Sequence, residues 1–146
     1  MAKGFQLKSG LQGETLYYPE HATAGSFKGG DLVDLNGGKV RLAAADTKIW
    51  GVAGKDAAGT VDTSTPVMLI SSDQIWVAWA DTTVNQTHVG NDFGLNIASA
   101  SCTVDIADTT TTSVVIQGID ERHVAGTTAR VLVKFQNGVI QNVDAA

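Results

Sequence analysis

One phrase occurs twice in this chain of 146 residues, and it constrains the fold more than any other feature. The stretch "IWGVAGKDAAGT" begins at Ile49, and "IQGIDERHVAGT" begins at Ile116. In a gapless alignment Ile, Gly, Ala, Gly and Thr recur at the same places, and Lys55 faces Arg122. We therefore expect one small structural unit to be built twice.

The glycines of the repeated phrase indicate where backbones come close or turn. Glycine inside a strand usually marks a bulge or the close approach of another backbone, so we expect Gly51 and Gly118 to lie in strands. Glycine also adopts positive φ without strain, so we expect Gly59 and Gly126 to lie in turns.

The likeness continues on both sides of the phrase. In the first half "GDLVDL", "VRLA" and "PVMLI" follow the same order as "FGLNI", "VDIA" and "RVLVKF" in the second. We interpret this as a degenerate internal duplication, with pseudo-repeats at about 30–80 and 90–136. The alternative is a chance likeness, because all β proteins share a vocabulary rich in Val, Gly and Thr.

Composition and turn residues favour an all-β fold. Glu is rare among the acidic residues, whereas Thr and Val are abundant and suit strands. Asn36-Gly37-Gly38 lies between two short alternating runs and predicts a hairpin turn, and Asn137-Gly138 predicts another. The polar stretch "TTVNQTHVGNDFG" predicts a long loop. No segment shows sustained helical spacing of apolar residues.

These signals predict an all-β chain with a compact β-barrel or β-sandwich. Residues 29–146 are expected to form a single β-domain. Residues 1–28 lack the regular alternation of the later segments, and we expect them to form an irregular N-terminal arm outside the main core.

Residues that carry catalysis or bind metals are too scattered to predict an active site. Cys102 has no second cysteine with which to form a disulfide or a metal knuckle. His21, His88 and His123 share no zinc-binding spacing. Residues 34–45 begin like a calcium loop but lack its final Glu. We expect a protein that is not an enzyme and holds no cofactor and no metal.

Charge and hydropathy argue against two classes of partner. The formal net charge is −5, and no basic patch of the kind that binds nucleic acid is visible. No apolar run is long enough to cross a membrane, and "MAKGFQLKSG" is not a secretory signal. We expect a protein made in the cytoplasm that contacts neither nucleic acid nor membrane.

The aromatic residues give the strongest indication of a partner surface. In "QIWVAWA", alternation places Trp79 on one face of a strand and Trp76 on the other. Such a strand is either buried on both sides or presents one Trp to a partner, since Trp is enriched at interaction hot spots. Trp50 occupies a similar setting in the repeated phrase.

Residues 27–70, "FKGGDLVDLNGGKVRLAAADTKIWGVAGKDAAGTVDTSTPVMLI", resemble the capsid decoration, or cement, proteins of tailed bacteriophages. The shared pattern is a Gly-Asp-Leu-Val strand, a Val-x-x-Ala strand, a Gly-Val-Ala strand, a Gly turn and an aliphatic strand. The chain departs from the compact members of this family in its longer N-terminus and in the "NQTHVGNDFG" loop.

The resemblance implies a non-enzymatic protein on the outer surface of the virion. It would bind the major capsid protein on the expanded head, commonly as a homotrimer, and clamp neighbouring capsid subunits. The candidate contact residues for the capsid or for other copies are the lysines and aromatics Lys3, Phe5, Lys8, Tyr17, Tyr18, Phe27, Trp50, Trp76 and Trp79. The alternative is a carbohydrate- or receptor-binding β-domain of a phage tail or fibre, with Trp76 and Trp79 as the sugar-stacking rings.

Overall fold

The computed structural model describes residues 3–10, 14–22, 26–44, 48–120 and 127–141, and these are nearly all in strands and turns. The all-β prediction is therefore confirmed. The elements in chain order are β1 (Gln6–Ser9), β2 (Thr15–Pro19), β3 (Leu32–Asn36), β4 (Lys39–Leu42), β5 (Gly51–Ala53), β6 (Ser64–Leu69), β7 (Ile75–Val84), η1 (Gln86–His88), β8 (Asp92–Asn96), β9 (Thr103–Asp105), β10 (Val114–Ile119), β11 (Thr127–Phe135) and η2 (Asn137–Val139).

The first half of the chain forms a small barrel, called here the first barrel, from β2 to β6. Its strands lie in the order β2-β6-β5-β3-β4, and every neighbouring pair is antiparallel. Glu20, directly after β2, forms a parallel bridge with Val40 of β4. This bridge joins the two outer strands, so the sheet closes on itself.

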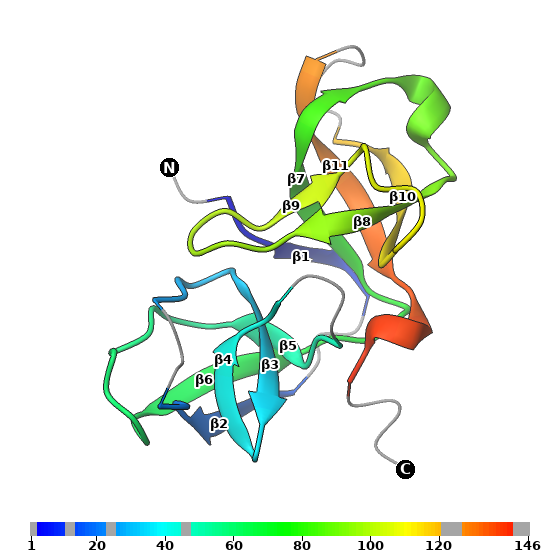
Figure 1. Ribbon diagram of the computed structural model, residues 1–146. Coiled ribbons are helices and arrows are strands. Elements are labelled where there is room, and N and C mark those ends of the chain that lie inside the picture. Colours follow the sequence, from blue (N-terminus) through cyan, green and yellow to red (C-terminus); the bar gives the residue numbers. More distant parts are fainter. Residues whose placement is uncertain (1–2, 11–13, 23–25, 45–47, 121–126, 142–146) are drawn as a thin grey trace.

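The second half forms an equivalent unit, the second barrel, from β7 to β11. Its strands lie in the order β7-β11-β10-β8-β9, again with antiparallel neighbours. Strand β9 then pairs in parallel with β7, where Trp79 lies opposite Thr103. Figure 1 shows the two barrels one above the other. The two barrels therefore have the same strand order, the same pattern of antiparallel pairs and the same closure by a parallel pair.

The structural unit differs in its limits from the pseudo-repeats predicted at about 30–80 and 90–136. Strand β7 lies inside the first of those ranges, but it pairs with β11 and belongs to the second barrel. Strand β2 lies before that range, but it pairs with β6 and belongs to the first barrel. The sequence likeness misses β2 and β7 because these opening strands share no residue pattern.

The two in-strand glycines were predicted correctly, and each has a different physical role. A Cβ on Gly51 would overlap the carbonyl oxygen of Met68 and lie 2.7 Å from a methyl group of Val67. Gly118 instead follows a register shift between Ile116 and Gly118, which is a bulge in the β10–β11 pair. Gly59 has φ +82° in a turn, and Gly126 lies outside the described residues.

The turn predictions had mixed outcomes. Gly37 and Gly38 have φ of 61° and 77°, as the two-residue turn between β3 and β4 requires, which confirms this hairpin. The second predicted hairpin is wrong, because Asn137–Val139 form the 3-10 helix η2 and Ile140 then bridges to Ile49. The predicted loop after β7 is shorter than expected, since β7 continues to Val84.

The prediction that residues 1–28 form an irregular arm outside the core is wrong. Strand β1 pairs with β7 of the second barrel, and β2 is a strand of the first. The side chains of Phe5 and Phe27 are 2% and 0% exposed. Because these aromatic side chains find their burial within the chain itself, they need no partner surface to cover them.

The two ends of the chain tie the barrels together (Figure 1). At the N-terminal end Phe5 donates its N–H to Gly30 of the first half, and β1 then joins the second barrel. At the C-terminal end Gln141 donates its N–H to Ile49, and its side-chain amide forms two hydrogen bonds with the backbone of Leu35. A segment from the N-terminal end therefore completes part of the second barrel, and a segment from the C-terminal end completes part of the first.

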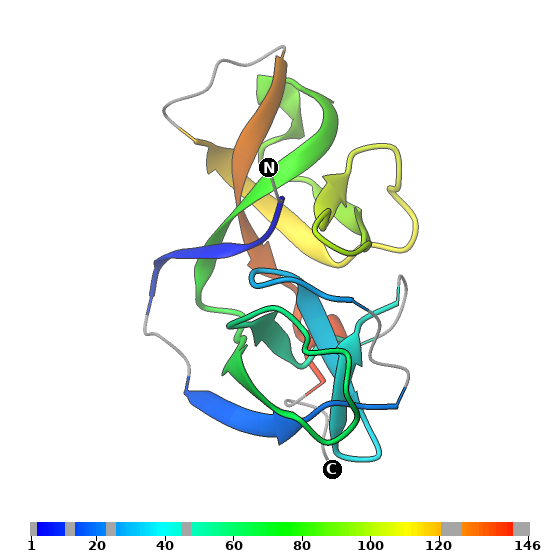
Figure 2. The same cartoon turned by 90° about the vertical axis from the view of Figure 1, so that its left-hand side faces the viewer.

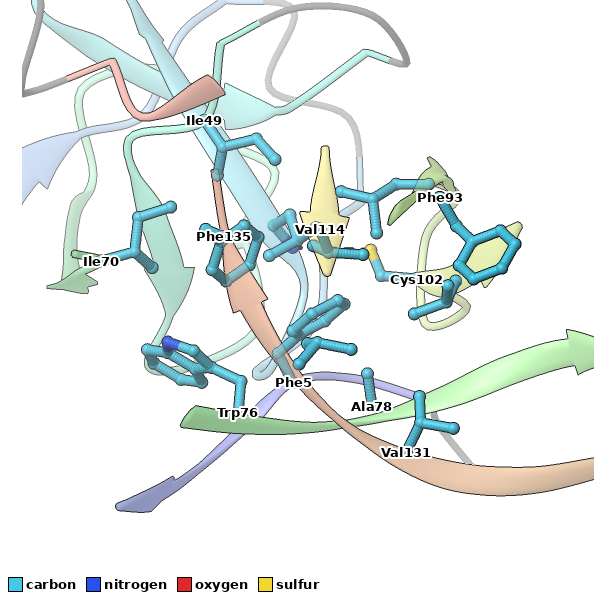
Figure 3. Packing of buried hydrophobic residues seen from close by; sticks show 14 of the residues in the cluster. Phe5, Ile49, Ile70, Trp76, Ala78, Phe93, Cys102, Val114, Val131 and Phe135 are labelled. Carbon is cyan, nitrogen blue, oxygen red and sulfur yellow. Dashed lines mark hydrogen bonds between the residues drawn. The ribbon is translucent and has the colours of Figure 1, made fainter. Parts of the chain in front are cut away.

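A single hydrophobic cluster runs through the junction between the barrels (Figure 3). The ring of Phe5 lies 5.4 Å from that of Phe135, and the ring of Trp76 lies 6.3 Å from Phe135 at a steep angle. Ile49 and Ile70 of the first half pack into the same cluster. A smaller cluster around Phe27 fills the first barrel.

We predict that Gly51→Ala destabilises the protein much more than Gly118→Ala. The new methyl group at position 51 meets backbone that cannot move cheaply, and overpacking of this kind costs about 1–3 kcal/mol or more. At position 118 the nearest atom is 3.9 Å away, in the flexible side chain of Leu132. Urea unfolding of the two variants measures the difference, and equal losses would contradict the roles assigned here.

We also predict that Phe5→Ala costs about 3–5 kcal/mol of folding free energy, as for other buried aromatic residues. Lys8→Ala, a change at an exposed bulge position of β1, is the matched control and should cost less than about 0.5 kcal/mol. Thermal and denaturant unfolding of both variants provide the measurement. Wild-type stability in Phe5→Ala would restore the idea of an arm outside the core.

Candidate interaction surface

Strand β2 carries two of the three exposed large apolar side chains in the described part of the chain. Tyr17 is 68% exposed and Leu16 is 40% exposed. Val61, which is 46% exposed, lies in the loop that leads into β6. These three residues, with the outer edge of β2, are called here the β2 surface. Leu16 and Tyr17 lie on opposite faces of β2 because they are consecutive strand residues. Exposed apolar side chains along a strand edge make β2 the candidate interaction site.

The backbone of β2 is paired on one side only along most of its length. Its residues pair with β6, from Thr15 opposite Met68 to Pro19 opposite Ser64. On the other edge, pairing among the described residues begins only at Glu20, with its bridge to Val40. Within the described ranges, the edge before Glu20 is therefore open. Figure 2 shows β1 and β2 along one side of the molecule.

The buried carboxylate of Glu20 fixes the loop that carries Val61. It accepts hydrogen bonds from the N–H groups of Ala58 and Gly59 at 2.8 and 3.1 Å and from the hydroxyl of Thr65 at 3.3 Å. The carbonyl of Glu20 also accepts the N–H of Asp62, next to Val61. Because a buried carboxylate must be hydrogen-bonded, this network holds the loop beside the end of β2.

A half-buried aromatic pair lies next to this surface. The rings of Tyr18 and Trp50 meet edge to face at 6.0 Å. The indole nitrogen of Trp50 is buried and has no hydrogen-bond partner in the described part of the chain. This aromatic pair packs against the hydrophobic cluster inside the first barrel, so Tyr18 anchors β2 to that cluster.

A cleft of about 660 Å³ lies between the two barrels, and Thr15 of β2 is at its rim. Its walls come from the segment before and within β1, from β5 and β6, and from the first residues of β7. Trp79 and Arg130 lie on the second-barrel side, where Lys3 stands 5.7 Å above the Trp79 ring. Arg130 contacts the side chain of Gln6 at 3.3 Å and the buried Asp120 at 3.6 Å.

Three of the residues predicted from sequence to contact the capsid or another copy are buried within the chain. Phe5, Phe27 and Trp76 are at most 2% exposed, so their side chains cannot reach a partner while the protein is folded. The apolar pattern on both faces of β7 arises because Trp76 faces the core and Trp79 faces the cleft. Trp76 therefore cannot supply a sugar-stacking ring either.

The remaining predicted contact residues lie at the surface or half-buried, but not in one patch. Lys3 and Trp79 meet at the cleft, Tyr18 and Trp50 meet beside β2, and Tyr17 is on the β2 surface. Lys8 is exposed on β1. Sequence reasoning missed Leu16 and Val61, and the signal for Leu16 was its place in "TLYYP", where apolar residues occupy both faces of a short strand.

The described residues contain no group of three or more His, Cys, Asp or Glu side chains placed to hold a metal ion.

His88 accepts the N–H of Asn85 on Nδ1 at 2.9 Å, which leaves Nε2 as the protonated nitrogen. Asp92 and Asp108 have lowered pKa values, because Thr112 and Gln136 donate to the first and Thr111 and Thr110 to the second. Asp108 therefore stabilises the turn that follows it, whereas Asp92 joins β8 to the residues that precede β10 and follow β11.

Cys102 is buried at the junction of the barrels and is not arranged as a nucleophile. Burial, reinforced by the negative charge of Asp31, raises the pKa of its thiol to about 12. The thiol donates to Asp31 at 3.7 Å and accepts the N–H of Leu32 at 3.5 Å. Asp31 in turn accepts the N–H groups of Lys28 and Ala100, so this polar cluster joins the two halves.

No family model, no curated protein and no solved structure matches this chain. In the described part of the chain, no helix is both long and apolar enough to span a membrane.

We predict that Cys102 reacts with thiol reagents only after unfolding. The folded thiol stays protonated up to a pH of about 12, whereas the unfolded thiol ionises near its ordinary pKa of 9.0. The unfolded state therefore loses a proton first as the pH rises, so folding stability should fall above about pH 9. Denaturant unfolding at pH values of about 8 and 10 should show a smaller fall for Cys102→Ala than for the wild type. A thiol that reacts rapidly in the native protein would contradict this placement.

Proposed function

We propose that this chain is a non-enzymatic capsid decoration protein of a tailed bacteriophage. It binds the outside of the expanded head and stabilises it by clamping neighbouring subunits of the major capsid protein, with a homotrimer as its assembly on the capsid. The protein is made in the bacterial cytoplasm and ends in the virion. The resemblance of residues 27–70 to that family first suggests this role.

The observation that carries the proposal is the β2 surface on a rigid double barrel. Leu16, Tyr17 and Val61 expose apolar area where a protein partner can cover it. The two barrels share one hydrophobic cluster and exchange terminal segments, so the molecule can transmit force between contacts without separating. Many weak contacts of this kind give firm retention when copies bind a lattice together.

The test is co-sedimentation with expanded and unexpanded heads of the phage that encodes the chain. We expect wild-type protein to sediment with expanded heads and Tyr17→Ala to bind at least about tenfold more weakly, as for a truncated aromatic hot spot. Thr109→Ala, a change at an exposed position of the second barrel, is the matched control and should bind normally. Failure of wild-type protein to bind expanded heads would refute the proposed function.

A further inference from the structure

The equivalent barrels differ at one strand edge. In the second barrel, the edge of β7 carries two strands in succession. Strand β1 pairs antiparallel with its first residues, where Leu7 lies opposite Trp76, and β9 pairs in parallel from Trp79 onward. In the first barrel, β2 has only the parallel closure at Glu20. The place on β2 that corresponds to β1 on β7 has no strand among the described residues.

The backbone groups on this open edge can be assigned from the pairing with β6. Leu69 donates its N–H to Glu14 at 3.0 Å, so this pair is hydrogen-bonded. Because hydrogen-bonded pairs alternate in an antiparallel ladder, Leu16 also faces β6. Thr15 and Tyr17 then point their N–H and C=O groups outward. Pro66, opposite Tyr17, fits this assignment because it has no N–H to offer.

We propose that β2 pairs edge to edge with β2 of a second copy of this chain across a two-fold axis. In this antiparallel register Leu16 lies opposite Leu16 of the other copy, and Thr15 lies opposite its Tyr17. Thr15 and Tyr17 of each copy offer two N–H donors and two C=O acceptors. In this register each donor bonds to an acceptor of the other copy, so all of these groups are satisfied. The exposed Leu16 side chains meet on the two-fold axis. They form a non-hydrogen-bonded pair, and the two residues of such a pair approach each other closely.

A second copy fits this edge because of its residues. Thr15 to Pro19 contain no charged side chain, so two identical strands do not repel each other at the axis. Pro19 has no N–H and ends the ladder directly before the Glu20 bridge, which restricts the register. The contact is isologous, and it does not depend on the proposed function. It uses the same β2 surface as the proposed head contact, so a copy that binds a head through this surface would not be paired in this way.

The pairing is expected to be weak in solution. A ladder of so few residues buries far less than the roughly 1,000 Å² of a stable complex. The dissociation constant should therefore be about millimolar.

The experiment is sedimentation velocity and amide NMR of the free protein from about 10 μM to about 1 mM. We expect concentration-dependent dimerisation, with shift changes centred on residues 14–19. Thr15→Pro removes an outward N–H and should weaken the dimer at least about tenfold, whereas Thr15→Ala should change it less than about twofold. Thermal unfolding checks that each variant remains folded.

A second pair of variants tests the register without proline. Leu16→Asp and Leu16→Lys each place like charges on the axis and should be monomeric alone, while their mixture should form a heterodimer. A wild-type monomer at about 1 mM without concentration-dependent shifts would overturn the proposal. So would a dimer whose shifts lie elsewhere or that persists in Thr15→Pro and Leu16→Asp. Failure to bind phage heads would refute the proposed function and leave this pairing intact.

Discussion

The packing of Phe5 against Phe135 is the contact on which the arrangement of the two barrels depends. Phe5 arrives from the N-terminal end and Phe135 ends the last strand, so the contact joins the two extremes of the chain. Phe5 is also hydrogen-bonded to Gly30, and a Cβ at Gly4 would lie 2.8 Å from the Gly30 carbonyl oxygen. The close backbone approach allowed by glycine therefore brings the aromatic ring into the core. Neither barrel can leave the other without exposing this cluster.

The polar cluster of Asp31 and Cys102 complements that apolar contact. Asp31 is buried, and its carboxylate accepts N–H groups from Lys28 of the first half and Ala100 of the second. A buried carboxylate tolerates only an arrangement in which its oxygens stay hydrogen-bonded. The apolar cluster supplies most of the driving force, while Asp31 fixes how the barrels are oriented. The molecule is therefore expected to unfold as one cooperative unit.

The sequence predicted the features that depend on local chemistry. The hairpin at Gly37 and Gly38 follows from residues that tolerate positive φ, and Gly51 follows from a close backbone approach. The strands β1 and β2 could not be predicted in the same way, because their partners lie far along the chain and each strand is very short. Burial of Phe5 depends on contacts between the barrels. The irregular apolar pattern of residues 1–28 therefore predicted a free arm, whereas this segment contains the strands β1 and β2.

The same argument explains why the candidate site was only half predicted. Tyr17 was selected as an aromatic, but the structural feature that makes it a candidate contact residue is the open edge of β2, which no residue pattern reveals. The edge is open because only one of the two equivalent barrels receives an additional strand. That strand is β1, and it pairs with β7 of the second barrel. In the described part of the chain, the two equivalent barrels thus have different strand edges. The first barrel keeps the pairing capacity that the second has used internally, so an interaction surface can arise in a repeat without any new structural element.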